Sequence, residues 1–161
     1  MQGPTGMPMQ GGIFDSSTLQ KYITRLPRPQ PIQPLCENKF RIAMVETKHI
    51  FHPQLGLTNV WFYNGLAVPM LEVCRGKDIY VQWANDLPKK HLLSDAIDPT
   101  IMGAEPNLPA VRNAVHLHGG EQAPFSDGGP LAWFTPGTDV IYHYPNQQLP
   151  TMLLWHDHCI G

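Results

Sequence analysis

The chain has 161 residues and a mass of 18.1 kDa, which leaves room for one domain with its own core but hardly for two. Its formal charge of −2 at pH 7 provides no basic surface for a phosphate backbone or an anionic membrane, so we expect neither as a partner. With 17 prolines, 14 glycines and only 15% charged residues, the composition favours short strands joined by turns. We therefore expect an all-β fold.

Targeting signals and cysteines give a weaker indication of location. No apolar run approaches the roughly 18 residues that a membrane helix needs, and the start of the chain, MQGPTGMPMQGG, lacks the basic and apolar parts of a secretory signal. Cys36, Cys74 and Cys159 are too few and too scattered for a disulfide framework, and an odd count leaves one unpaired. A reducing compartment is expected rather than secretion.

The composition divides the chain into an arm, residues 1–37, and a domain, residues 38–161. The arm is rich in Pro, Gly, Gln and Met, and the run LPRPQPIQP at 26–34 predicts extended backbone because each proline fixes φ. From Lys39 onward, runs of β-branched and aromatic residues end in turn-forming residues, which is typical of strands. We expect the arm to wrap over a surface of the domain.

Six segments of the domain predict β-strands, and a proline-containing stretch from 87 to 110 predicts a long surface connection. Short strands with long joints favour a Greek-key sandwich or barrel. The last predicted strand ends at the C-terminus, and a strand edge left uncovered there is prone to pair with another chain. We therefore expect the domain to lack its last strand and to be completed by residues outside this chain. The predicted strands are 40–51, 60–65, 78–86, 111–119, 138–145 and 151–158.

Two His-x-His motifs carry the functional signal: His116-Leu117-His118 and His156-Asp157-His158. Residues i and i+2 of a strand project from one face about 6 to 7 Å apart, a separation that suits two neighbouring ions better than one. Imidazole ligands suit copper, zinc, nickel or iron, and copper binds most tightly in the general order. Two adjacent strands would thus offer four nitrogen ligands to a metal cluster.

The other histidines have simpler interpretations. One His-x-His motif alone is more often a polar edge or a packed pair, so the metal hypothesis depends on there being two. We interpret His49, His52 and His91 as surface or turn residues. His143 alternates with two tyrosines in YHYPN, which favours packing and hydrogen bonding over metal ligation.

Three segments resemble the first cupredoxin domain of multicopper oxidases, in the bacterial spore-coat laccase and bilirubin oxidase branch: AVHLHGGEQAPFSDG at 114–128, YHYPNQQ at 142–148 and LLWHDH at 153–158. WFYNGLAVPMLEV at 61–73 and DIYVQWANDLP at 78–88 fit the same domain. The similarity runs from about Ser17 to the end, and it adds spore association to the expected locations.

The resemblance implies a role for individual residues. His116 would bind the type 2 copper and His118 a type 3 copper, while His156 and His158 would each bind one of the two type 3 coppers. Asp127 matches an acidic residue near the oxygen channel that supplies protons, and we expect it to be catalytic. A turn-forming Asp before Gly-Gly is the alternative interpretation of Asp127.

The sequence also departs from the family pattern. The resemblance implies four further histidines and a His-Cys-His segment with a type 1 copper in later domains, none of which is in this chain. Cys159 follows His158 outside such a context, and we do not assign it to a type 1 site. VPM at 68–70 replaces a Pro-Gly-Pro turn, which affects the expected loop shape and not the ligands.

The expected function is therefore a copper-dependent oxidoreductase of the laccase type, completed by a second chain or by missing C-terminal domains. Its partners would be O₂ and a small reducing substrate: a phenol, a tetrapyrrole or a metal ion. The isolated chain is expected to be inactive. A copper-binding or copper-delivery module without oxidase activity is the alternative. A zinc hydrolase is weaker, because no acidic residue stands at a suitable spacing to act as a base beside three ligands.

Overall fold

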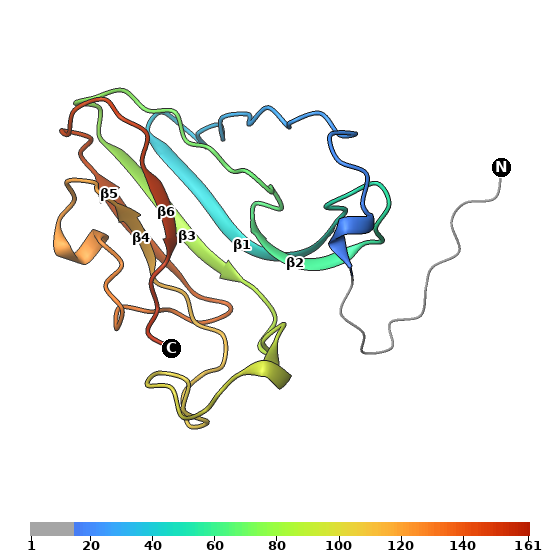
Figure 1. The fold of residues 1–161 in the computed structure, drawn as a ribbon. Helices are drawn as coiled ribbons and strands as arrows, with labels where there is room; N and C mark the ends of the chain where they lie inside the picture. Colours follow the sequence, from blue (N-terminus) through green and yellow to red (C-terminus); the bar gives the residue numbers. More distant parts are fainter. Residues whose placement is uncertain (1–14) are drawn as a thin grey trace.

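Six strands in two sheets make up the regular structure of the computed structural model, which describes residues 15–161 (Figure 1). Each predicted strand segment overlaps one strand, so the all-β prediction is confirmed. Residues 15–161 contain no α-helix, only three 3-10 turns at Ser16–Thr18, Ser94–Ala96 and Pro124–Ser126. The first 14 residues of the predicted arm lie outside the described residues. The strands are β1 (Lys39–His49), β2 (Thr58–Tyr63), β3 (Ile79–Asp86), β4 (Val115–His118), β5 (Asp139–Tyr144) and β6 (Leu154–Asp157).

The larger sheet has the strand order β2-β1-β3-β5. β1 pairs antiparallel with β2 and parallel with β3, and β3 pairs antiparallel with β5. In β3, Ile79, Val81 and Trp83 are buried and alternate with polar or partly exposed residues, as a strand with one core-facing side requires. This alternation directs one face of the sheet toward the second layer.

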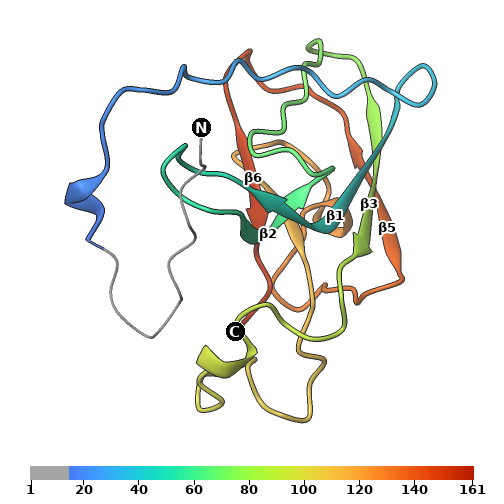
Figure 2. The same ribbon diagram turned by 90° about the vertical axis from the view of Figure 1, so that its right-hand side faces the viewer.

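The smaller sheet contains β4 and β6, and it packs over that face so that the fold has two layers (Figures 1 and 2). Three aromatic rings join the layers: Trp83 lies 5.7 Å from Trp155 between ring centroids, and Tyr63 lies 5.9 Å from Trp83 and 6.1 Å from Trp155. Trp83 is 1% exposed and donates its Nε1–H to the hydroxyl of Tyr144 at 3.1 Å. The core therefore fixes β6 against β3.

The predicted ranges 111–119 and 151–158 are longer than the strands that form there. Before β4, Asn113 forms an isolated bridge with Phe134 through two backbone hydrogen bonds. Beyond β6, the amide of His158 still donates to the Ala114 carbonyl at 2.7 Å. Pairing of β4 with β6 thus continues past the regular strand at the end that carries His158.

The arm and the connection after β3 are the two regions for which the sequence predicts irregular backbone. The arm is attached by a parallel bridge between Pro31 and Met70, where the Ile32 amide donates to the Met70 carbonyl at 2.8 Å. The connection after β3 is irregular apart from its single 3-10 turn at Ser94–Ala96. Within residues 15–161, no helix has the length and apolar character to span a bilayer.

Candidate metal centre

The four imidazoles of the two His-x-His motifs gather on one face of the β4–β6 sheet. Adjacent strands bring them together because β4 and β6 pair antiparallel with His116 directly opposite His156. Leu117 and Trp155 are also paired, and they belong to the other face, which packs on the core. The centroid distances are 5.7 Å for His116–His118, 5.5 Å for His116–His156, 4.8 Å for His116–His158, 5.7 Å for His118–His156 and 5.5 Å for His156–His158.

Backbone carbonyls fix the orientation of three of the rings. The Nδ1 atom of His116 lies 2.6 Å from the Asp127 carbonyl oxygen, that of His158 lies 3.1 Å from the Gly128 carbonyl, and that of His156 lies 2.9 Å from the Asp157 carbonyl. A carbonyl oxygen can only accept a hydrogen bond, so Nδ1 carries the proton in each neutral ring. The Nε2 atoms of these rings are then left with a free lone pair, which is the form that binds a metal ion.

The segment after β4 supplies two of these carbonyls. It turns back at Gly119, reaches the short turn Pro124–Ser126 and passes beside β4 at Asp127 and Gly128. Gly128 has φ +66°, and a Cβ atom there would overlap the Val115 carbonyl group, so only glycine allows this approach. The role of Gly128 is not predictable from residue type, because the partner of His158 is a main-chain oxygen; the Gly-Gly after Asp127 is the one signal in the sequence.

Two side chains anchor this segment to its surroundings. The buried Ser126 hydroxyl accepts a hydrogen bond from the His143 amide of β5 at 3.0 Å. Gln122 donates to the Leu117 carbonyl at 3.0 Å and also to the Asp127 carboxylate. The carbonyls that face the histidines are therefore positioned by contacts to both sheets.

The distance between metal-binding atoms differs from the strand-spacing expectation. That expectation separated the two rings of one motif by too much for a single ion. In the structure, one potential ligand atom from each of His116, His118 and His156 lies within 4.8 Å of the other two. The difference arises because side-chain rotation and the cross-strand partner His156 bring nitrogens closer than Cβ atoms along one strand.

The two acidic residues near the histidines have different contacts. Asp127 lies on the histidine side, with its Oδ1 atom 3.1 Å from His116 Nδ1. Asp157 lies between the two histidines of its motif in sequence, and its Oδ1 accepts from the amides of Ala114 at 2.9 Å and Cys159 at 3.2 Å. Asp157 therefore holds the end of β6 to β4. The carboxylate of Asp127 faces a ring instead.

The remaining histidines lie outside the cluster. His143 stacks on Tyr80 with centroids 4.8 Å apart, and its Nε2 atom lies 2.8 Å from the Asp78 carboxylate. The interpretation of His143 as a packing and hydrogen-bonding residue is confirmed. His52 contacts the Gln20 carbonyl. His49 packs edge-on to two phenylalanines and His91 to Trp61.

The three cysteines are free in the structure. Cys36 and Cys74 are exposed, and burial raises the pKa of the Cys159 thiol above its ordinary value of 9.0. A raised pKa keeps that thiol protonated at neutral pH, whereas a metal ligand is the thiolate. This agrees with leaving Cys159 outside the ligand set.

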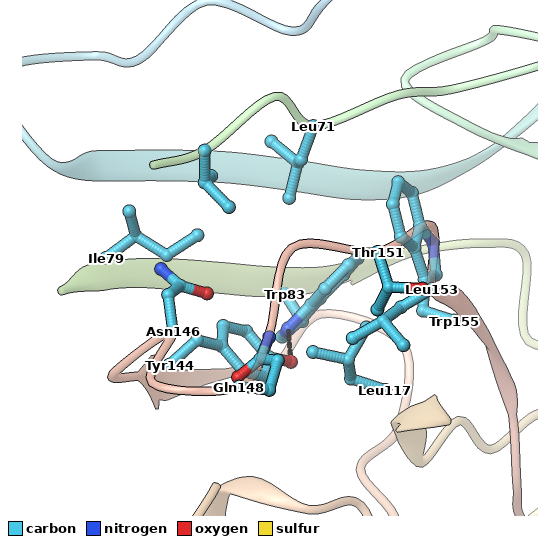
Figure 3. Close-up of a pocket in the computed structure, with 11 residues that line it drawn as sticks. Leu71, Ile79, Trp83, Leu117, Tyr144, Asn146, Gln148, Thr151, Leu153 and Trp155 are labelled. Atoms are coloured by element: carbon cyan, nitrogen blue, oxygen red, sulfur yellow. Dashed lines mark hydrogen bonds between the residues drawn. The ribbon is translucent and has the colours of Figure 1, made fainter. Parts of the chain in front are cut away.

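An apolar cavity lies behind the histidine face, on the core side of Leu117. It has a volume of about 120 Å³, and Figure 3 shows Leu117, Trp83 and Trp155 at its wall, with Asn146 and Gln148 among the polar side chains that line it. Leu117 separates the cavity from the two histidines of its motif. The metal-binding face and the core therefore lie on opposite sides of one strand.

Known proteins resemble this chain in sequence and in fold. No protein-family model matches it. It is 39% identical over 159 residues to the laccase of Bacillus subtilis (strain 168), covering 89% of this chain and 31% of the laccase. It is 40% identical over 135 residues to multicopper oxidase LPR1 of Arabidopsis thaliana, covering 75% of this chain and 23% of that protein.

A solved structure shows the same fold. The laccase from Pediococcus acidilactici superposes with a TM-score of 0.64 at 20% identity, covering 88% of this chain and 28% of the laccase. The chain thus spans less than a third of the relatives it matches, and it shares the cupredoxin-like fold of that segment. The resemblance carried by the two His-x-His motifs is confirmed: this chain is a relative of the multicopper oxidases.

Proposed function

We propose that this chain supplies half of the histidine ligands of a trinuclear copper cluster in a laccase-type oxidoreductase that reduces O₂ to water. One observation carries the proposal: the four imidazoles of the two motifs share one face of the β4–β6 sheet, and five of their six pairs have centroid distances of 4.8 to 5.7 Å. His116 is assigned to the type 2 copper, and His118, His156 and His158 to the type 3 pair. The remaining ligands and the type 1 copper would come from domains outside this chain.

The donor set fits copper. Nitrogen donors exclude the oxygen-seeking ions calcium and magnesium, and copper binds such sites more tightly than the other divalent first-row metals. Neutral imidazoles do not offset the repulsion between neighbouring copper ions. The rings must therefore be held in fixed positions to keep several cations close together. In this chain the carbonyls of Asp127, Gly128 and Asp157 fix three of the rings with Nδ1 protonated.

The chain's residues would bind and orient the metal ions. Copper, when bound, would supply one-electron redox chemistry to the reduction of O₂. β4 and β6 set the spacing of the ligands, and the segment 119–128 sets the tautomers of His116 and His158. The proton-supplying role that the resemblance gives Asp127 stays a prediction, whereas its contact with His116 supports a positioning role.

A reconstitution experiment tests the proposal. The purified chain should show no oxidation of a phenolic dye, since it spans only 31% of the Bacillus subtilis laccase. Combined with the remaining domains of such an oxidase and loaded with copper, it should give oxidase activity, and metal analysis by element should find copper. Robust turnover by the chain alone, or a complete assembly whose activity survives His116→Ala, would contradict the proposal. His52→Ala serves as the matched control.

One observation favours a second candidate. Ligand atoms of His116, His118 and His156 lie within 4.8 Å of one another on this chain alone, so a single copper ion has three donors without any partner domain. A copper-binding or copper-delivery module would use these donors without oxygen chemistry. It predicts stoichiometric copper uptake by the chain and no gain of oxidase activity when the other domains are added.

A further inference from the structure

The side chain of Gln122 joins the segment after β4 back to β4 itself. Its Nε2 atom donates to the Leu117 carbonyl at 3.0 Å and to Oδ1 of Asp127. A carbonyl and an ionised carboxylate can only accept, so the amino group of the amide faces both of them and uses both of its hydrogens. Gln122 therefore connects the main chain next to His116 with the carboxylate that contacts this histidine.

The Asp127 carboxylate has few other contacts that could fix its direction. Its Oδ1 atom lies 3.1 Å from His116 Nδ1, and among the described residues its only other hydrogen-bond partner is Gln122. The side chain is 42% exposed, so water competes for the carboxylate. The backbone of Asp127 is fixed separately, because its amide donates to the Pro124 carbonyl and its own carbonyl faces His116. What Gln122 adds is therefore the direction of the carboxylate.

The position of Gln122 is destabilising in one respect and requires a glycine nearby. Its Oε1 atom is buried and has no partner in the described part of the chain, and a buried unpaired acceptor costs stability. A Cβ atom at Gly120 would overlap this Oε1 atom and come within 2.8 Å of the Leu117 side chain. A methionine of the same length would fill the space without an unpaired oxygen. Stability alone therefore does not explain a glutamine at this position.

We propose that Gln122 is a positioning residue for His116 and that it acts through the Asp127 carboxylate. The Nδ1–H group of His116 faces the Asp127 carbonyl at 2.6 Å and, with the carboxylate oxygen held at 3.1 Å, has a second acceptor that is charged. A charged acceptor holds the proton on Nδ1 more firmly than a neutral one, and it makes Nε2 a stronger donor to a metal ion. The benefit for copper rests on the proposed function, whereas the arrangement of the three side chains does not.

A comparison of His116 with His158 isolates what Gln122 adds. Both rings present Nδ1 to a backbone carbonyl of the same segment, at 2.6 Å for His116 and 3.1 Å for His158. Of the two rings, only that of His116 also lies within ion-pair distance of a carboxylate among residues 15–161. Loss of the Gln122 amide should therefore affect His116 and leave His158 unchanged. His158 thus provides an internal reference within the same protein.

Nitrogen-15 NMR of the metal-free chain at alkaline pH, where imidazoles are neutral, reports the tautomer of each ring. Gln122→Met keeps the length of the side chain but has no donor, so the ratio of the Nδ1–H to the Nε2–H tautomer of His116 should fall at least about threefold. The ratio for His158 should stay as in the parent chain. Gln82→Met is the matched control, because Gln82 also donates to an aspartate, Asp139, at 3.0 Å in the larger sheet, and it should change neither ring. An unchanged His116 ratio in Gln122→Met overturns the inference.

A double-mutant cycle separates this role from a general effect on the fold. Asp127→Ala removes the carboxylate, and in that background Gln122→Met should cause no further change in the His116 ratio, because the group through which Gln122 acts is gone. A further fall of the same size would mean that Gln122 acts through the Leu117 carbonyl instead, and it would refute the proposal.

A second variant keeps the test decisive if Gln122→Met does not fold. Gln122→Glu keeps the shape of the side chain, removes both N–H donors and adds a charge that repels the Asp127 carboxylate, so it should lower the His116 ratio in the same direction. A ratio that stays at the parent value in Gln122→Glu contradicts the proposal. Because no copper is present in these measurements, their outcome is independent of whether the chain belongs to an oxidase.

Discussion

The imidazole rings of His116 and His158 stack with their centroids 4.8 Å apart and their planes at 27°, although His116 lies in β4 and His158 follows β6. The Nδ1 atom of each ring contacts a backbone carbonyl, that of Asp127 for His116 and that of Gly128 for His158, and these two residues are consecutive. The stack therefore depends on one short backbone segment. Changes in that segment should alter metal binding without touching a ligand.

Removing one imidazole should weaken copper binding. In a Cu²⁺ titration of the chain, His156→Ala is expected to raise the Kd at least tenfold, because loss of a ligand should cost more than loss of a supporting contact, which is worth about 10- to 100-fold. His52→Ala removes a histidine outside the cluster, which forms hydrogen bonds with the Gln20 carbonyl and the Gln54 amide, and it should leave the Kd unchanged. Equal effects of the two variants would refute the ligand assignment of His156.

Gly128→Ala should destabilise the protein more than Gly65→Ala. Both glycines have nearly the same positive φ, +66° and +68°, so both variants carry a strain of about 1–2 kcal/mol. Only the new Cβ at 128 overlaps another group, the Val115 carbonyl, whereas nothing lies within 4 Å of a Cβ at 65. Overpacking adds about 1–3 kcal/mol.

Urea unfolding of the two glycine variants measures their free energies of unfolding, and copper titration measures their affinity for copper. Gly128→Ala is also expected to weaken copper binding, because its carbonyl orients His158. A free energy of unfolding that is the same for both variants would show that the segment moves aside at little cost.

Asp157→Ala should destabilise the end of β6. It removes the acceptor of the Ala114 and Cys159 amides, and because Ala114 is buried, leaving its amide unpaired should cost about 1–3 kcal/mol. Asp157→Asn keeps an oxygen acceptor and should lose less. Asp139→Ala, which removes only an exposed contact with Gln82, is the control. Chemical denaturation measures the stability of each variant. An Asp157→Ala variant no less stable than the Asp139→Ala control would contradict this role of Asp157.

Alkaline pH should reduce stability through Tyr63. Burial, together with the nearby Asp157 carboxylate, raises the pKa of Tyr63 above its ordinary value of 10.0. Above pH 10 the unfolded chain therefore binds fewer protons at this group than the folded chain, so the stabilisation present below pH 10 is lost as pH rises. The full effect approaches about 1.4 kcal/mol per pH unit.

The matched variants for this pH effect are Tyr63→Phe and Tyr22→Phe. The first removes the titrating group, so its free energy of unfolding should fall less steeply above pH 10 than that of the parent chain. Tyr22 is 100% exposed, and its variant should follow the parent chain. Parallel curves for all three proteins would show that the Tyr63 hydroxyl is accessible to water.

Sequence patterns predicted the parts of the site that depend on side-chain periodicity. The alternation of side chains along a strand predicted that the two imidazoles of each motif lie on one face, and the structure agrees. The part that could not be predicted depends on the main chain. No residue type records that the Asp127 and Gly128 carbonyls face His116 and His158, and strand spacing alone gave ring separations longer than those the pairing produces.

The pairing of His116 with His156 also constrains how such a sequence can change. A strand exposes alternate residues, so one residue inserted within β6 would exchange its faces: His156 or His158 would enter the core and an apolar neighbour would leave it. The connection after β3 forms no strand, so a residue gained or lost there exchanges no strand faces. Length variation among relatives should therefore concentrate in that connection, whereas the number of residues between Leu154 and His158 should stay constant.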